Sequence, residues 1–292
     1  MERIRKVVRA PESTGKAKLL TVPLIIWLVV FVVIPLLLVA YYGFTVKADD
    51  GTVSVSFENF ARFADPLYVK VVLRSLKIAL ISTIVCLIVG YPVALIMSRS
   101  SSSMRSVIIM LILMPMWMNF MLRTYAWLTL LDKNGIINTL LSSFGLEKVN
   151  FASSEGTVIV GTVYNFLPFM IMSIYTVLIK LDNSILEAAY DLGATPIQRF
   201  FKIIVPFSIP GVLSGISMVF VPSVTTFAIS QYLSSGKVVL IGDTIEKQFG
   251  AANDWNFGAA ISLVIMVIVL LSMAAVNKMD DTGDIGERRM IL

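Results

Sequence analysis

Six apolar stretches constrain the fold of this chain more than any other feature of its sequence. Each has about 20 residues or more, which is the length that an α-helix needs to cross ~30 Å of hydrocarbon. Because the bilayer core has no water to satisfy backbone polar groups, such stretches cross it as helices. The sequence therefore predicts an all-α integral membrane protein with six transmembrane helices. They run over Leu19–Tyr42, Leu73–Met97, Val107–Leu131, Thr157–Ile179, Ile204–Ile229 and Phe257–Val276.

The distribution of Lys and Arg predicts the orientation of these helices. With the N-terminus inside, 14 of the 24 cationic residues fall on the inner side and nine on the outer side. Such an excess is typical of cytoplasmic segments. We expect a basic cytoplasmic segment over residues 1–18, a six-helix membrane domain over 19–277 with a long inner loop at 180–206, and a cytoplasmic tail over 278–292. Both termini are then cytoplasmic.

Several functions are excluded by what the sequence lacks. It has no G-x-x-x-x-G-K-[ST] motif, so the chain does not itself hydrolyse ATP. It has no His and one Cys, which removes the usual metal ligands and general base. No Asp or Glu lies inside the apolar stretches, where proton-coupled transporters place them. We expect a non-enzymatic chain that binds no cofactor, and energy for uphill transport would come from another subunit.

The inner loop before the fifth stretch has the pattern of two short helices. Ser184 and Glu187 have the spacing of a capping box, which starts a helix. Gly193 stands where a helix ends with positive φ. Thr195 and Gln198 repeat the capping-box pattern at the start of a second helix. The loop therefore predicts a short amphipathic helix, a tight turn and a second helix that leads into the membrane.

Three functions compete for this helix pair. It could anchor the loop at the membrane surface, form a DNA-binding helix-turn-helix, or dock onto a cytoplasmic motor. Arg199 and Lys202 are its only cations and the bilayer is adjacent, so we expect no nucleic-acid partner.

The sequence of the loop resembles the EAA loop of ABC-importer permeases of the type I fold. Its pattern is E-A-A, three residues, G, nine residues and I-x-L-P, and only Val205 departs from it, in place of Leu. The resemblance implies the type I permease fold and a coupling helix that enters a groove of an ATPase subunit. The implied coupling residues are Glu187, Ala188, Ala189, Asp191, Gly193, Ala194 and Pro206.

Five further stretches resemble permease subunits of spermidine/putrescine importers: LIVGYPVAL, LRTYAWL, LEAAYDLGAT, LIGDTIEKQF and DWNFGAA. This resemblance implies a polyamine importer in the bacterial plasma (inner) membrane. The implied partners are a cytoplasmic ATPase dimer that holds ATP and Mg, a second permease subunit, an extracytoplasmic polyamine-binding protein and membrane lipid. The alternatives are a permease of a related ABC importer for another small solute, and a stand-alone secondary transporter.

Polar and aromatic residues in or near the apolar stretches are candidates for the solute pathway, because they are costly in lipid. Carboxylates and aromatic faces also suit a flexible organic cation. The candidates are Trp117, Asn119, Tyr125, Tyr164, Asn165, Ser223, Thr225, Tyr232, Asp243, Glu246, Asp254 and Trp255. Asp49, Asp50, Glu58 and Asp65 are further outer carboxylates.

These candidates have simpler interpretations. The outer carboxylates could be solvated loop charges, and Trp117, Tyr125 and Trp127 could form an interfacial aromatic belt. Gly211 and Gly215 form a G-x-x-x-G motif, which predicts close helix packing rather than a pathway. We expect Arg123 to reach outward or to pair with a carboxylate, since it would repel a cation.

Overall fold

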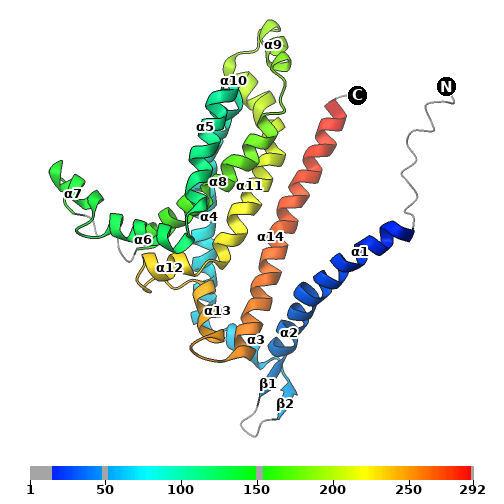
Figure 1. Cartoon of the computed structure of the whole chain (residues 1–292), viewed down its shortest axis with the longest axis vertical. Coiled ribbons are helices and arrows are strands. Elements are labelled where there is room, and N and C mark those ends of the chain that lie inside the picture. Colours follow the sequence, from blue (N-terminus) through cyan, green and yellow to red (C-terminus); the bar gives the residue numbers. More distant parts are fainter. Residues whose placement is uncertain (1–14, 48–51, 149–153, 291–292) are drawn as a thin grey trace.

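The computed structural model describes residues 15–47, 52–148 and 154–290 (Figure 1). Five of its helical segments are long and apolar enough to cross a membrane: Thr21–Gly43, Pro66–Arg99, Glu155–Leu178, Pro196–Thr225 and Trp255–Val276. A sixth is broken into Ser102–Trp117 and Phe120–Ser143, with a bend of 95° between the halves. The all-α prediction with six spans is therefore confirmed when the broken pair counts as one.

Three helices form the centre of the molecule. They are α4 (Pro66–Arg99), α8 (Glu155–Leu178) and α11 (Val205–Thr225), and they enclose a core that includes Cys86, Met170, Ile174 and Val219. The helices approach closely because small residues lie between them. An added Cβ at Gly211 would lie 2.9 Å from the Ser173 carbonyl oxygen of α8, and one at Gly215 would lie 2.6 Å from Met170 Sδ. The predicted packing role of this G-x-x-x-G motif is confirmed.

The first span stands away from this core (Figure 1). It consists of α1 (Gly15–Leu28), a π-helical turn over Val29–Val33 and α2 (Ile34–Gly43). Its apolar side chains are exposed almost throughout, and it meets the rest of the chain at α14 (Trp255–Met290), where Gly43 lies against Ala260 and Leu263. An apolar helix exposed on all sides is suited to lipid or to a partner helix.

A small outer region follows the first span. Strands β1 (Thr45–Lys47) and β2 (Val53–Val55) pair antiparallel, with Thr45 opposite Val55, and α3 (Glu58–Phe63) leads into α4. Asp65 caps α4 by accepting from the Leu67 N–H at 2.8 Å, and Pro66 occupies the first turn. Helix α4 consequently begins seven residues before the predicted second span. With 34 residues it is about 51 Å long, which exceeds the hydrocarbon thickness.

The prediction of a continuous third span over Val107–Leu131 is wrong. Helix α5 (Ser102–Leu113) passes into a 3₁₀ turn over Met114–Trp117, and the chain then bends before α6 (Phe120–Leu131) and α7 (Ile136–Ser143). Pro115 has no N–H to continue an α-helix. Asn119 caps the new helix, because its Oδ1 accepts from the Met121 N–H at 2.8 Å.

The predicted fifth span, Ile204–Ile229, extends too far at its C-terminal end and starts too late, since the helical segment is Pro196–Thr225. Helix α11 ends at Thr225, Thr226 is extended, and a separate α12 (Ala228–Leu233) begins after Phe227. Helix α13 (Ile241–Phe249) then packs against α11 and α14. The backbone therefore breaks at the end of a membrane helix, between α11 and α12.

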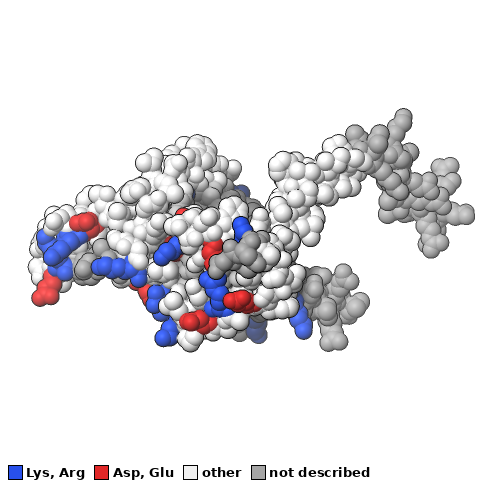
Figure 2. All heavy atoms as spheres, turned by 90° about the horizontal axis from the view of Figure 1, so that it is seen from below, with Lys and Arg blue, Asp and Glu red and all other residues white. Residues whose placement is uncertain are grey.

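The two ends of the molecule differ in character. Helices α9 (Asn183–Asp191) and α10 (Pro196–Arg199) lie at the same end as the last turns of α14 (Figure 1). Helix α10 continues through a π-helical turn over Phe200–Ile204 into α11. The β-hairpin and α3 lie at the opposite end. Seen from that side, acidic and basic side chains are interspersed (Figure 2). Residues 1–14 of the predicted N-terminal segment lie outside the described residues, and the helix of α14 continues through the predicted tail to Met290.

Candidate functional site

The predicted docking helix begins differently from the expectation. The prediction that Ser184 and Glu187 form a capping box is wrong: Asp182 is the N-cap, and its Oδ1 accepts from the Ser184 N–H at 2.9 Å. Asp is as good an N-cap as Ser, and it stands earlier in the chain, so α9 starts at Asn183. This backbone hydrogen bond lowers the pKa of the Asp182 carboxyl. The Glu187 side chain is consequently left out of the cap.

The turn after α9 matches its prediction. Gly193 has φ of +79°, and the Ala194 N–H donates to the Ala189 carbonyl at 2.9 Å while the Gly193 N–H donates to the Tyr190 carbonyl at 2.8 Å. These bonds close the helix in the manner of a Schellman motif.

The second helix begins as predicted. The Gln198 N–H donates to Thr195 Oγ1 at 3.3 Å, and the Thr195 N–H donates to Gln198 Oε1 at 2.9 Å. The capping box is therefore complete. Pro206 is the second residue of α11 and directly follows the π-helical turn, within a helical segment that is continuous from Pro196, so its missing N–H leaves one helical hydrogen bond unmade.

Helix α9 presents an open surface. No residue of α9 is buried, Leu192 beyond its end is 89% exposed, and Ile185 is 48% exposed. Among the described residues, no hydrogen bond or ion pair engages the Glu187 carboxylate. Glu187 and Asp191 line a hollow of about 450 Å³ together with Asn183, Leu186, Tyr190 and Arg199. The hollow thus combines two carboxylates with one guanidinium and apolar walls.

Two side-chain contacts position α9. Arg99, the last residue of α4, donates from Nη1 to Asn183 Oδ1, and the Arg199 guanidinium lies 5.3 Å from the centre of the Tyr190 ring. These contacts tie α9 to α4 and to α10.

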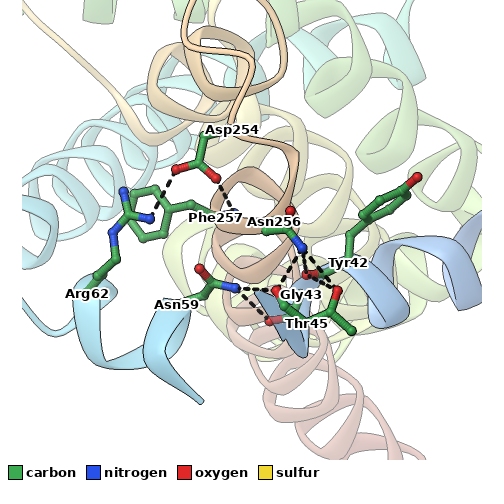
Figure 3. Close-up of polar contacts among 8 residues, drawn as sticks. All are labelled: Tyr42, Gly43, Thr45, Asn59, Arg62, Asp254, Asn256 and Phe257. Atoms are coloured by element: carbon green, nitrogen blue, oxygen red, sulfur yellow. Dashed lines mark hydrogen bonds and ion pairs between the residues drawn. The ribbon is translucent and has the colours of Figure 1, made fainter. Parts of the chain in front are cut away.

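At the opposite end, one polar cluster joins three segments (Figure 3). Arg62 of α3 donates to Asp254 Oδ2 at 3.0 Å and lies 4.2 Å from the Phe257 ring centre, while Asp254 Oδ1 accepts from the Phe257 N–H at 3.1 Å. Asp254 was predicted to face the solute pathway. Its two oxygens are engaged with a guanidinium and the first turn of α14, and its role in the pathway stays a prediction.

The same cluster anchors the end of the first span (Figure 3). Asn256 Nδ2 lies 3.0 Å from the Tyr42 carbonyl oxygen and 2.7 Å from that of Thr45, and Asn59 Nδ2 donates to the Thr45 carbonyl at 2.9 Å. The Tyr42 carbonyl belongs to the last turn of α2 and the Thr45 carbonyl to β1, so these two amides join the end of the helix and the start of the hairpin to α3 and α14. No sequence pattern indicated the role of either amide.

The predicted aromatic residues form two pairs beside α6. Tyr125 lies 5.1 Å from Tyr232 of α12, and Trp127 lies 5.2 Å from Tyr164 of α8, measured between ring centres. Trp117 does not join them, because it lies at the bend after α5 and is 82% exposed. Trp255 lies apart from both pairs, 5.8 Å from the ring of Phe249.

The smaller polar candidates mostly bond to their own helices. Asn165 is 4% exposed and donates to the Gly161 carbonyl, but its Oδ1 is buried with no hydrogen-bond partner. Ser223 is fully buried and donates to the Val219 carbonyl, and Thr225 is exposed at the end of α11. The Arg123 guanidinium lies 5.8 Å from the Phe120 ring, and among the described residues no carboxylate pairs with it.

Asp243 is the carboxylate with the most perturbed surroundings. Its Oδ2 lies 2.7 Å from Ser230 Oγ and 2.7 Å from the Leu240 nitrogen, whereas Oδ1 is buried without a hydrogen-bond partner. Burial raises the pKa of the Asp243 carboxyl to about 6, against the lowering effect of those two hydrogen bonds. Glu246, one turn later, is exposed. Asp49 and Asp50 lie outside the described residues.

One further ionic cluster was not predicted. Glu155, the first residue of α8, lies 3.5 Å from Arg74 and 2.5 Å from Lys77, both on α4. Only the parallel packing of α4 and α8 reveals it, because the partners are far apart in the sequence.

Comparison with known proteins places this geometry in a family. Residues 87–280 match the family described as "Binding-protein-dependent transport system inner membrane component". The chain is 37% identical over 262 residues to the spermidine/putrescine transport system permease protein PotB of Haemophilus influenzae, covering 88% of this chain and 92% of that protein. It is 37% identical over 251 residues to PotB of Escherichia coli K12, covering 85% and 91%.

The fold is similar to that of a solved bacterial ABC transporter involved in the import of alginate. The TM-score is 0.77 at 17% sequence identity, covering 91% of this chain and 94% of the other. The family match, the similar fold and the open helix pair agree. The chain belongs to the family of binding-protein-dependent transport system inner membrane components, and it is the multi-pass, non-catalytic permease of an ABC importer in the inner membrane.

Proposed function

We propose that this permease carries polyamines of the spermidine/putrescine class into the cell. The observation that carries the proposal is the 37% identity over 88% of the chain to a spermidine/putrescine permease. Identity of this extent supports a shared solute class more strongly than the fold does, since the alginate transporter has a similar fold at 17% identity.

The chemistry of the predicted pathway fits such a solute. A polyamine has ammonium groups separated by apolar methylenes, which suit carboxylates and aromatic faces. The Tyr125–Tyr232 and Trp127–Tyr164 pairs supply aromatic faces, and Asp243 and Glu246 supply negative charge. We assign these residues to the route of the solute, together with Asn165 in the middle of α8 and Ser223 and Thr225 at the end of α11.

The free energy of ATP hydrolysis would reach the permease through α9. A cytoplasmic ATPase dimer holds ATP and Mg, this chain binds no cofactor, and α9 docks into a groove of one ATPase subunit. The exposed Ile185 and Leu192 offer apolar surface for that contact. Glu187, unpaired in the chain beside its hollow, would meet a cation of the ATPase in a partly desolvated contact.

The remaining partners follow from the same assignment. A second permease subunit completes the pathway, and an extracytoplasmic polyamine-binding protein delivers the solute. Closure of the ATPase dimer moves α9, and the pathway alternates between an outward and an inward opening. Arg99 and the α10–α11 continuity would transmit the movement, because they join α9 to α4 and α11.

The test is uptake of labelled spermidine by cells that lack this chain. The wild-type chain is expected to restore uptake, and Glu187→Arg is expected to abolish it at an equal membrane level. Glu147→Arg is the matched control: it makes the same charge change at an exposed position beyond α7, remote from α9. Failure of the wild type to restore uptake would refute the polyamine assignment and favour another small solute.

A further inference from the structure

The helical segment that leads from α10 into α11 has a weak point. The segment is continuous over Pro196–Thr225, but it includes the π-helical turn over Phe200–Ile204, and Pro206 follows soon after that turn. A π-helical turn is rare and occurs mostly at functional sites, and a proline removes a helical hydrogen bond. Helices bend at such points. A movement of α9 and α10 would therefore be lost as bending here unless another contact supports the turn.

Helix α4 has a weak point of its own. Pro92 lies inside α4, where its missing N–H leaves the Ile88 carbonyl without a helical donor. The inner part of α4, from Tyr91 to Arg99, can then bend relative to the outer part. Arg99 already connects this inner part to the start of α9, because it donates from Nη1 to Asn183 Oδ1. The inner part of α4 is therefore in contact with the docking helix and able to move separately.

Tyr91 connects these two weak points. Its hydroxyl oxygen lies 2.8 Å from Ser208 Oγ, and its ring meets that of Phe200 edge-on, with 6.0 Å between the ring centres and 85° between the ring planes. Phe200 is the first residue of the π-helical turn, whereas Ser208 lies two residues beyond Pro206. One side chain of α4 therefore contacts the α10–α11 segment on both sides of its weak point.

The hydroxyl groups of Tyr91 and Ser208 form a chain with a defined direction. Ser208 is fully buried and donates from Oγ to the Val205 carbonyl at 2.8 Å. Its single proton is thus used, so the Tyr91 hydroxyl is the donor to Ser208. Among the described residues, this is the only side-chain hydrogen bond between α4 and α11. Because the Tyr91 hydroxyl is engaged with a fully buried partner, its position favours a mechanical role over contact with the solute.

We propose that Tyr91 is a positioning residue that ties the inner part of α4 to the α10–α11 segment across the π-helical turn. When α9 moves with the ATPase, the Tyr91–Ser208 hydrogen bond and the contact with Phe200 carry the movement into α4, so that it is not lost as bending at the turn. Helix α4 passes the movement on to α8, which packs along it in the core. This inference rests on the proposed coupling through α9 and deepens it.

The first measurement is transport by the complete importer in proteoliposomes, with its ATPase, second permease and binding protein. The spermidine accumulated per ATP hydrolysed is compared for wild type, Tyr91→Phe and Tyr68→Phe. Tyr91→Phe keeps the ring against Phe200 and removes only the hydroxyl. Tyr68→Phe is the matched control at the outer end of the same helix, where the ring packs on Phe257 and the hydroxyl has no hydrogen-bond partner among the described residues.

The expected result is a loss of coupling in one variant only. Tyr91→Phe should lower the spermidine accumulated per ATP about threefold to tenfold, the range for one hydrogen bond between membrane helices. Its basal rate of ATP hydrolysis should equal that of the wild type, because the exposed surface of α9 is unchanged. Tyr68→Phe should retain the wild-type ratio.

The second measurement does not depend on the solute. Amide hydrogen exchange of the same complexes is recorded by mass spectrometry with and without Mg and an ATP analogue that is not hydrolysed. In the wild type, the nucleotide is expected to change exchange in α9 and in the inner part of α4. In Tyr91→Phe, the change should persist in α9 and fall in the inner part of α4.

Other outcomes overturn the proposal. A wild-type exchange response in α4 of Tyr91→Phe would do so, as would an unchanged transport ratio or an equal fall in transport and ATP hydrolysis, which is the effect of a merely structural residue. If Tyr91→Phe does not assemble, Ser208→Ala breaks the same hydrogen bond from its other side, and failure of both would assign the pair to folding alone. No spermidine uptake by the wild type would refute the polyamine function, and the exchange response would still decide the role of Tyr91.

Discussion

Replacement of Gly211 by Ala tests how tightly α8 and α11 pack. The new Cβ would lie 2.9 Å from the Ser173 carbonyl oxygen, 3.0 Å from Val177 Cγ2 and 3.1 Å from Ile174 Cα. Two of these three atoms belong to the backbone of α8, which cannot rotate away as a side chain can. The two helices must therefore separate by several tenths of an ångström along their contact.

The expected cost is that of an overpacked core, about 1–3 kcal/mol. For a chain of this size, such a cost lowers the melting temperature by roughly 2–12 °C. The assay is thermal unfolding of the purified transporter complex in detergent, followed by the loss of its monodisperse elution peak. Membrane insertion and expression level are measured in parallel.

Two glycines provide matched controls for this prediction. Gly215→Ala meets Met170 Sδ at 2.6 Å, but a flexible thioether can shift, so the loss should be smaller. Gly156→Ala finds only Ser154 Oγ at 3.6 Å and should leave stability unchanged or raise it by up to about 1 kcal/mol. A melting temperature for Gly211→Ala equal to that of the wild type would refute the packing argument, as would a larger loss in Gly156→Ala.

Three further predictions concern polar contacts. Asn256→Leu should lower the free energy of unfolding by about 0.5–1.5 kcal/mol, because the Tyr42 and Thr45 carbonyls lose a partly buried donor; chemical denaturation of the complex measures this, and an unchanged midpoint would contradict it. Since the folded-state pKa of Asp243 is raised from 3.8 to about 6, the folded chain binds its proton more tightly than the unfolded chain, so this group's contribution to stability falls as pH rises from about 4 to about 6 and is constant above. The difference in melting temperature between wild type and Asp243→Asn, recorded across that range, should show this trend; a difference independent of pH would rule it out. Thr195→Ala should destabilise α10 by about 1 kcal/mol and speed amide hydrogen exchange there and not in α8, which exchange measured by mass spectrometry would reveal.

Local sequence patterns predicted the helices and turns that depend on neighbouring residues. Apolar length located the spans, and Gly193 and the Thr195–Gln198 capping box marked the turn between α9 and α10 correctly. The errors arose where a local pattern had two solutions. Asp182 and Ser184 are both good N-caps, and the earlier one starts the helix. The break in the third span has a local cause too, because Pro115 and the Asn119 cap both favour a new helix start there.

The candidate site was predictable in part. The exposed helix α9 followed from its motif, because a short amphipathic helix and the glycine turn after it depend on consecutive residues. Which outer carboxylates are paired and which are buried did not follow from the sequence. Asp254 is engaged by Arg62, 192 residues away in the chain, and nothing near Asp254 in the sequence indicates that partner.

The sequence by itself determined that the chain crosses a membrane, roughly where its spans lie and that the loop before the fifth span forms two short helices, since these properties depend on apolar length and on residues within one or two turns. The tertiary structure alone decided which polar side chains are paired, which are shielded and where the third and fifth spans break. Pairing and burial depend on the packing of segments that are distant in the sequence. That packing is why Asp254 is bound to a guanidinium while Asp243 retains a buried oxygen without a donor.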